Sequence, residues 1–292
     1  MVELWTQRED IGPPPQAAWA RLDYDRDRGV AVLLGWPPVA TPRAHTWEWD
    51  GSVWVQVDDM GPPPWCTIAC MSDQQAVLAL SYASFARQTW ERKNAQWTQV
   101  SDTGANPAGG LVYDDSRSRA ITMGFSSPAT GFLETWEWDG AAWTLVADTG
   151  PSTRSDFAMT YDATNKVTVL FGGIEYTTWK LLRDTWIWNG TQWKQASDMG
   201  PAARGDAGFT HDATKGRSLL FGGTDWTVNP LILYGDTWGW DGTLWRQLSD
   251  MGPTPRTGVG LCFDRDRQHA VLFGGWASAQ ALGDTWEYFD HT

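Results

Sequence analysis

Short apolar stretches alternate with Gly- and Asp-rich turns along the whole chain, and the pattern returns about every 48 residues. In the repeat spanning 143–190, four stretches bounded by turn residues read WTLVAD, FAMTYD, VTVLFGG and DTWIWNG. Stretches of four to seven residues with this alternation are typical of short β-strands, and the Asn-Gly and Asp-Gly turns between them favour tight hairpins. Each repeat therefore predicts four antiparallel strands.

Tryptophan marks each repeat twice, at positions seven residues apart. The pairs are Trp47/Trp54, Trp90/Trp97, Trp136/Trp143, Trp186/Trp193 and Trp238/Trp245. Trp286 opens a sixth repeat, but its partner would be residue 293 and the chain has 292 residues. Near the other end, Trp5 in WTQRE matches Trp97 in WTQVS. We therefore expect the amino-terminal segment to supply the last strand of the sixth repeat.

Six four-stranded repeats, the last of which is completed by a strand from the amino terminus, predict an all-β, six-bladed β-propeller of antiparallel blades. Residues 1–10 would supply the outer strand of the last blade, within a single domain over 1–292. An open ring would leave an unpaired strand edge at each end. The amino-terminal strand is expected to remove that edge.

The repeats also resemble the kelch repeat of stand-alone bacterial propellers. The resemblance rests on a Gly pair that ends one strand, an aromatic-Asp-Gly hairpin, a Trp, and a Pro and Arg before the next strand. The Gly pair is intact at Gly173, Gly223 and Gly275, and is degraded in the other three repeats. Kelch propellers include enzymes, sugar-processing proteins and protein-binding modules, so the resemblance implies a fold and leaves the function open.

Composition narrows the class of partner. The 22 tryptophans indicate a packing role, and the net charge of −13 argues against binding nucleic acid or an anionic membrane. The three cysteines are too few for a disulfide framework, and no apolar run approaches the roughly 20 residues of a membrane span. The first residues do not form a signal peptide. We expect a soluble, cytoplasmic and monomeric protein, or a secreted one if a leader was removed.

One face of the predicted propeller carries loops that differ in length after each Gly pair. The fourth repeat has ten residues there, Ile174–Arg183, and the fifth has twelve, Thr224–Gly235. Every repeat has an aromatic residue in this loop: Trp36, Tyr82, Phe125, Tyr176, Trp226 and Trp276. Since function concentrates where loops vary on a rigid scaffold, these rings could form a collar for a flat, sugar-like or cationic ligand. Alternatively, each ring seals a junction between blades.

Two repeats place a carboxylate at the start of the innermost strand. Aligning the segments that begin these strands puts Asp156 and Asp206 opposite small or neutral residues, namely Ala18, Thr67, Gly110 and Gly258. Two carboxylates in a partly dry site raise one pKa and can act as acid and base, or hold a cation through oxygen ligands. The alternative is that each Asp accepts loop N–H bonds or pairs with a nearby Arg.

An arginine precedes the carboxylate position by two residues in the last three repeats, as Arg154, Arg204 and Arg256, and Trp65 stands there in the second. Kelch repeats usually carry Arg at this place, which implies a structural role that ties neighbouring blades. The same groups could instead line the channel mouth and hold an anionic ligand.

These observations favour binding of a small aromatic, terpenoid or sugar-like molecule on the aromatic face, without a cofactor or metal. The alternative is a cofactor-independent cyclase, isomerase, epimerase or lyase that uses Asp156 and Asp206 as acid and base. A second alternative is a propeller that binds a protein or peptide.

Overall fold

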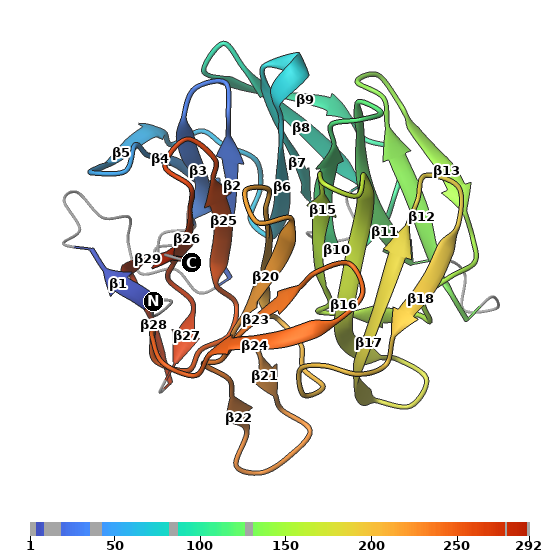
Figure 1. Cartoon of the computed structure of the whole chain (residues 1–292). Helices are drawn as coiled ribbons and strands as arrows, with labels where there is room; N and C mark the ends of the chain where they lie inside the picture. Colours follow the sequence, from blue (N-terminus) through green and yellow to red (C-terminus); the bar gives the residue numbers. More distant parts are fainter. Residues whose placement is uncertain are drawn as a thin grey trace.

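A computed structural model of the protein describes residues 4–8, 19–35, 43–81, 87–125, 131–277 and 279–290. Within them, six antiparallel sheets form a ring around a central channel, as the sequence predicts (Figure 1). Blade 1 contains β2 Arg21–Asp25, β3 Val30–Gly35, β4 His45–Trp49 and β5 Trp54–Asp58. Blade 2 contains β6 Cys66–Met71, β7 Ala76–Ser81, β8 Gln88–Lys93 and β9 Gln96–Ser101, with the short 3-10 helix η1 Ser72–Gln74.

The remaining blades keep this order from the channel outward. Blade 3 contains β10 Pro107–Asp114, β11 Arg119–Phe125, β12 Leu133–Trp138 and β13 Trp143–Ala147. Blade 4 contains β14 Arg154–Ser155, β15 Ala158–Asp162, β16 Val167–Glu175, β17 Lys180–Trp188 and β18 Trp193–Ser197. Blade 5 contains β19 Gly208–Asp212, β20 Arg217–Phe221, β23 Thr237–Trp240 and β24 Trp245–Ser249.

Blade 6 joins the two ends of the chain. It contains β25 Gly260–Asp264, β26 His269–Phe273, β29 Thr285–Phe289 and β1 Leu4–Gln7. Strand β1 pairs antiparallel with β29, from Leu4 opposite Phe289 to Gln7 opposite Trp286. The amino-terminal strand therefore completes the last blade, which confirms the predicted closure, and the two ends lie close together (Figure 1).

The paired tryptophans link the blades through a complete ring of hydrogen bonds. In each blade, the outer-strand indole N–H donates to the buried threonine hydroxyl of the Thr-Trp motif in the preceding blade, at 2.7–2.9 Å. The six bonds are Trp54–Thr285, Trp97–Thr46, Trp143–Thr89, Trp193–Thr135, Trp245–Thr185 and Trp5–Thr237. Because the threonines are buried, these bonds fix each blade against its neighbour.

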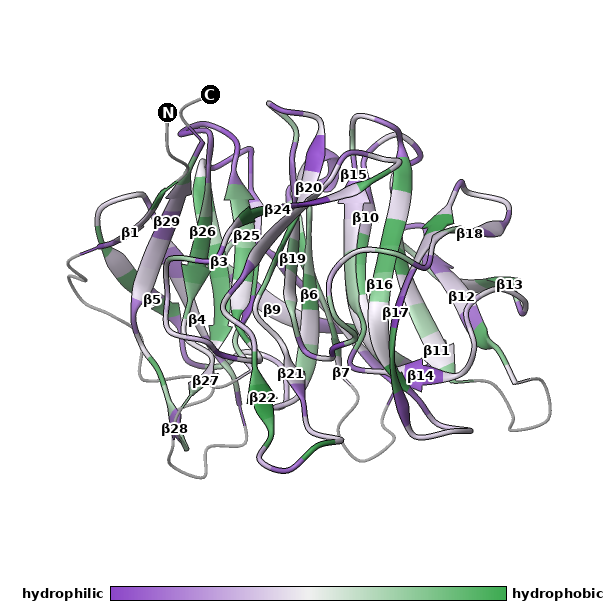
Figure 2. Ribbon diagram, turned by 60° about the horizontal axis from the view of Figure 1, so that its bottom comes forward, coloured by the Kyte–Doolittle hydropathy of each residue, from purple (hydrophilic) through white to green (hydrophobic). Residues whose placement is uncertain are grey.

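Apolar side chains from adjacent blades fill the space between the sheets. One cluster joins Leu22 of blade 1 to Cys262 and Val271 of blade 6. Figure 2 shows hydrophobic residues on blade strands such as β6, β16 and β26 and hydrophilic residues in the connecting turns. All three cysteines are buried and unbridged. Within the described ranges, no helix is both long and apolar enough to cross a membrane.

The loops after the Gly pairs differ from the prediction in blades 4 and 5. Strands β16 and β17 continue through most of Ile174–Arg183 and leave only 176–179 as the turn. β16 continues across a bulge at the Gly pair, where Gly173 adopts a φ of 91° and donates its N–H to the Arg204 carbonyl of blade 5 at 3.0 Å. In blade 5, the predicted loop contains the hairpin β21 Thr224–Asp225 and β22 Ile232–Leu233, and blade 6 has a matching hairpin of β27 Trp276–Ala277 and β28 Gln280–Ala281. The loop predicted at 82–87 lies outside the described residues, apart from Arg87.

Candidate functional site

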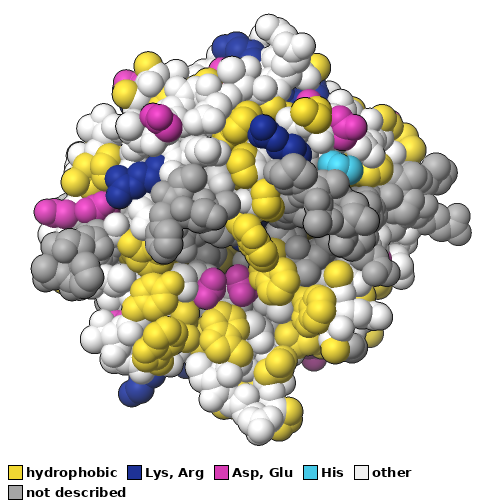
Figure 3. Space-filling view, turned by 180° about the vertical axis from the view of Figure 1, so that it is seen from behind, with side chains coloured by type: hydrophobic (Ala, Val, Ile, Leu, Met, Phe, Trp, Pro, Cys, Tyr) yellow, Lys and Arg dark blue, Asp and Glu magenta, His cyan; other side chains and the backbone are white. Residues whose placement is uncertain are grey.

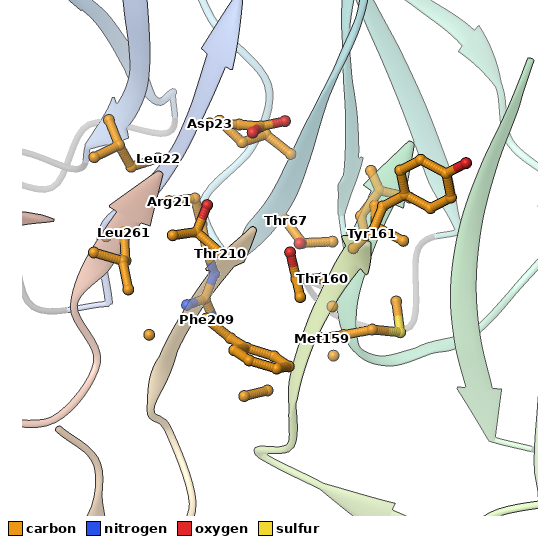
Figure 4. A pocket seen from close by; sticks show the side chains of 18 of the residues that line it. Arg21, Leu22, Asp23, Thr67, Met159, Thr160, Tyr161, Phe209, Thr210 and Leu261 are labelled. Carbon is orange, nitrogen blue, oxygen red and sulfur yellow. The ribbon is translucent and has the colours of Figure 1, made fainter. Parts of the chain in front are cut away.

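A cavity of about 550 Å³ occupies the central channel, and residues from the inner strands of all six blades line it. Figure 4 shows polar side chains from four blades, Arg21, Thr67, Thr160 and Thr210, around its middle. The inner strands run parallel to one another, since each begins at the variable-loop face and ends at the turn face. The cavity therefore has one end at each face of the propeller.

At the variable-loop end, a residue with left-handed backbone conformation stands at the same distance from the last residue of the inner strand in five blades. Counting back six residues from the last residue of each inner strand gives Trp19, Trp65, Asp156, Asp206 and Gly258. Their φ angles lie between 53° and 63°. This region is uncommon for residues other than Gly and costs about 1–3 kcal/mol where the structure enforces it.

This register corrects the alignment made from the sequence. The equivalent of Asp156 in blade 2 is Trp65 and not Thr67, which lies inside β6. In blade 1 it is Trp19 and not Ala18, which lies outside the described residues. Two register shifts in β10 interrupt the count in blade 3, where Gly110 has a φ of 64°. The sequence alignment matched the first residues of the segments, whereas equivalent positions in the structure are found by counting back from the last residue of each inner strand.

The structure brings Asp156 and Asp206 together. The Asp206 N–H donates to the Asp156 carbonyl at 2.8 Å, and both residues line the cavity. Ser155 Oγ donates to Asp156 Oδ2 at 2.8 Å. In Figure 3, two acidic side chains lie side by side near the middle of the face, with hydrophobic side chains around them.

The two carboxyl groups depend on each other electrostatically. Burial raises the pKa of Asp156, against the opposing effects of the Ser155 hydrogen bond and the Arg21 charge. Burial, followed by the negative charge of Asp156, raises the pKa of Asp206 to about 7, although Arg21 and a hydrogen bond from Trp19 act in the other direction. Near neutral pH the pair therefore retains a proton for part of the time.

Aromatic rings lie at the same end of the propeller as this acidic pair. Phe125 and Tyr176 line the cavity with their ring centroids 5.2 Å apart, and Tyr176 also contacts Trp179 at 5.7 Å. On the opposite side, Trp19 stacks on Trp276 at 6.2 Å and lies 6.4 Å from Trp65.

Trp226 lies directly beside the acidic pair, against the backbone of Gly205. A β-carbon at Gly205 would lie 2.5 Å from Trp226 Cη2 and 3.3 Å from Asp156 Cβ, so a side chain at this position would displace the ring. We call Trp19, Trp65, Trp226 and Trp276 the aromatic rim. Trp36 and Tyr82 of the predicted collar lie outside the described residues.

Arg154, Arg204 and Arg256 are at most 2 % exposed and do not line the cavity. Each guanidinium group forms a bidentate ion pair within its own blade, with Asp184, Asp236 and Asp284 respectively, at 2.6–3.0 Å. Each also donates to two backbone carbonyls. Contact between blades comes from the arginine backbone, as in the bond from Gly223 N–H to the Arg256 carbonyl at 2.9 Å. This geometry supports the structural alternative, because these groups have little surface left for a ligand.

Sequence reasoning missed Trp19, Arg21, Ser155 and Trp179. Counting back from Asp25, which ends the first inner strand, would have found Trp19, since Asp162 and Asp212 end the equivalent strands. No pattern in the sequence could have identified Arg21 as a cavity residue, because the residues around it do not show which side chains of the strand point into the channel.

The turn-face end of the cavity is bridged by ion pairs. Arg26 of blade 1 binds Asp115 of blade 3 at 2.7 Å, and Arg265 of blade 6 lies 3.6 Å from the same carboxylate. All three residues line the cavity. In the part of the chain that the structure describes, no three His, Cys, Asp or Glu side chains are grouped as a metal site.

No protein-family model and no curated protein matches this chain. Its fold is similar to that of a gluconolactonase from Xanthomonas campestris, described as important in glucose secondary metabolic pathways. The TM-score is 0.59 at 13 % identity, over 99 % of this chain and 98 % of the other. It is also similar to a chain in a nidogen/laminin complex, with a TM-score of 0.52 at 13 % identity over 80 % of each. These likenesses support a six-bladed propeller and do not single out the kelch type.

Proposed function

We propose that the channel mouth binds a small aromatic, terpenoid or sugar-like molecule between the aromatic rings and the pair formed by Asp156 and Asp206. The observation that carries this proposal is the pair itself, placed beside Trp19 and Trp226 at the end of a cavity of about 550 Å³. Ligand pockets commonly have volumes of about 300–1,000 Å³ with apolar walls and a few convergent polar groups.

Backbone strain at the mouth supports the same proposal. Trp65 has a φ of 63° and is 50 % exposed, so neither its backbone conformation nor burial of its ring accounts for tryptophan at that position. Strained positions of this kind concentrate where they position groups for binding. The kelch assignment also remains a proposal, supported by the Gly pairs and the buried arginines at the positions usual for that repeat.

A second candidate function is acid/base catalysis by the same pair. Because the pKa of Asp206 is raised to about 7, one carboxyl group can donate a proton and the other accept one near neutral pH. Isomerisation, epimerisation, cyclisation or elimination on a bound ligand would use such a pair. The fold is compatible with enzyme activity, since a propeller of similar shape is described as a gluconolactonase.

The double change Asp156→Asn, Asp206→Asn separates these functions. Asn keeps the side-chain shape and tolerates a positive φ, so we expect the fold to remain intact. Ligands are first found by a thermal-shift screen of small molecules, and each is then measured by calorimetry and by product analysis. Turnover lost while affinity stays within a few-fold would assign catalysis to the pair. Unchanged affinity and unchanged turnover would remove the carboxylates from the proposal.

The aromatic rim is tested by Trp226→Ala, Trp276→Ala, which should weaken ligand binding at least about tenfold through lost ring contact. Asp225→Asn, next to Trp226 in the sequence, is the matched control, because it keeps both rings and the shape of its own side chain, and it should change nothing. If the double Trp variant binds as tightly as the wild type, these rings only pack the loops. If the screen finds no small molecule whose binding is weakened by the Asp or Trp changes at the channel mouth, the proposed function is overturned.

A further inference from the structure

We infer that the ligand is an organic ammonium ion, held by the carboxylates of Asp156 and Asp206 and packed against the aromatic rim. This inference rests on the proposed small-molecule site and names the chemical class that the site selects.

The first argument is the local charge. Two carboxylates face the cavity at this end, and among the charged groups of the described residues Arg21 acts on both. With both carboxylates ionised, these three groups carry a surplus of one negative charge. A single monocation balances it, whereas an anionic ligand would increase the repulsion. The protein's net charge of −13 also favours the approach of cations.

The second argument is the position of the indole rings. Trp19 binds Asp206 through its indole N–H, and Trp226 lies against Gly205 beside Asp156. Each carboxylate therefore has an electron-rich ring next to it. Trp65 and Trp276 extend the aromatic surface from Trp19 toward solvent. An ammonium group over a tryptophan ring is attracted to the negative face of the ring, and the carboxylates accept its N–H bonds.

The third argument is the proton that the pair retains near neutral pH. An ammonium ion must replace this proton, because the proton and the ammonium group would both occupy the small space between the Asp156 and Asp206 carboxyl groups. Burial and the Asp156 charge raise the pKa of Asp206 to about 7, so the doubly ionised pair becomes about tenfold more populated from pH 6 to pH 8. Binding of an ammonium ion should strengthen by a similar factor over that range.

Two other carboxyl groups line the cavity with a pKa that burial raises: Asp115, which pairs with Arg26 at the turn-face end, and Asp23. Burial raises the pKa of Asp23 to about 6, although it accepts N–H bonds from Cys70 and Tyr24. Its side chain belongs to β2, deeper in the channel than Trp19 and Asp206. An Asp206→Asn variant therefore separates the two contributions to any pH dependence.

Calorimetric titration with benzylammonium and with benzyl alcohol at pH 6, 7 and 8 tests the inference. The two probes have similar size, and only the first is charged. We expect at least tenfold preference for benzylammonium at pH 8, affinity that falls about tenfold by pH 6, and proton release seen as a dependence of the heat on the buffer. Asp206→Asn should abolish the pH dependence from pH 7 to 8, and Asp225→Asn should retain it. Trp226→Phe should lose less affinity for benzylammonium than Trp226→Leu.

Equal affinity for the two probes would overturn the ammonium inference and leave the proposed small-molecule site standing. Failure of benzylammonium to bind at millimolar concentration, while a neutral ligand from the screen still binds, would have the same meaning. Calcium ion alone that binds to the wild type, is lost with Asp206→Asn and excludes benzylammonium would assign the pair to a metal and overturn the inference. Absence of every ligand would overturn the proposed function itself.

Discussion

Asp206 combines two unfavourable features at one residue. Its backbone has a φ of 53°, and Gly258 holds the equivalent place in blade 6 without a side chain. Its carboxyl group lies where burial and Asp156 oppose ionisation. Residues that carry such costs concentrate at binding and catalytic sites, and removing them commonly stabilises a protein.

Asp206→Asn should therefore stabilise the protein, in a pH-dependent manner. The pKa of Asp206 rises from 3.8 to about 7 on folding, so the folded state holds more protons than the unfolded state between about pH 4 and pH 7. Stability contributed by this group falls as the pH rises through that window, and Asn has no such loss. We expect a gain on the order of 1–3 kcal/mol at pH 8 that shrinks toward zero at pH 4, measured by urea unfolding. A gain of equal size at both pH values would show that the carboxyl charge is not its cause.

At the scale of strands and blades, the sequence predicted the number of blades, the strand order and the closure, because turn chemistry and the tryptophan spacing repeat in every blade. It singled out Asp156 and Asp206, since they break the pattern of the other repeats, and left open whether the two face each other. It could not place Trp19 beside them, because that depends on the register of β2 against the other inner strands. It also missed that β16 and β17 continue past the Gly pair, across a bulge between Phe171 and Gly173 that the spacing of apolar residues does not show.

The bond between Trp245 and Thr185 offers a test of coupling between neighbouring blades. Thr185 is fully buried and accepts the indole N–H at 2.8 Å, so Thr185→Val leaves that donor without a partner. We expect each of Thr185→Val and Trp245→Phe to destabilise the protein by about 1–3 kcal/mol. The double variant should lose less than the sum of the two, since it removes both partners. Thr144→Val, on exposed strand β13, should have little effect, and strict additivity of the first two would argue against the bond.

In the whole molecule, blade 6 is held together by segments from both ends of the chain. Besides the pairing of β1 with β29, Arg8 N–H donates to the Thr285 carbonyl at 3.0 Å and Arg8 Nε lies 3.3 Å from Glu287. Trp5 continues the ring of indole–threonine bonds into blade 5. Gly252, with a φ of 145°, makes room for this indole, because a β-carbon there would lie 2.4 Å from Trp5 Cδ1.

Deletion of residues 1–10 should consequently expose the β29 edge and the buried Thr237 hydroxyl, and give insoluble or aggregated protein. Light scattering and a thermal melt measure this outcome. Trp5→Phe is the control that keeps the strand and loses only the indole bond, so it should remain soluble with a lower melting temperature. A soluble deletion variant that melts cooperatively would show that β1 is not needed to close the ring.

Because all six junctions between blades use the same indole–threonine bond, blade 6, which contains the chain ends, is joined to its two neighbours in the same way as every other blade. Leu4 lies opposite Phe289, so a short linker could join the described ends. A circular permutant opened instead in another loop between blades would keep all six bonds and the cavity between them. The fold would then not depend on which blade contains the chain ends. A chain that starts in any of the six blades could form the same propeller with the same cavity.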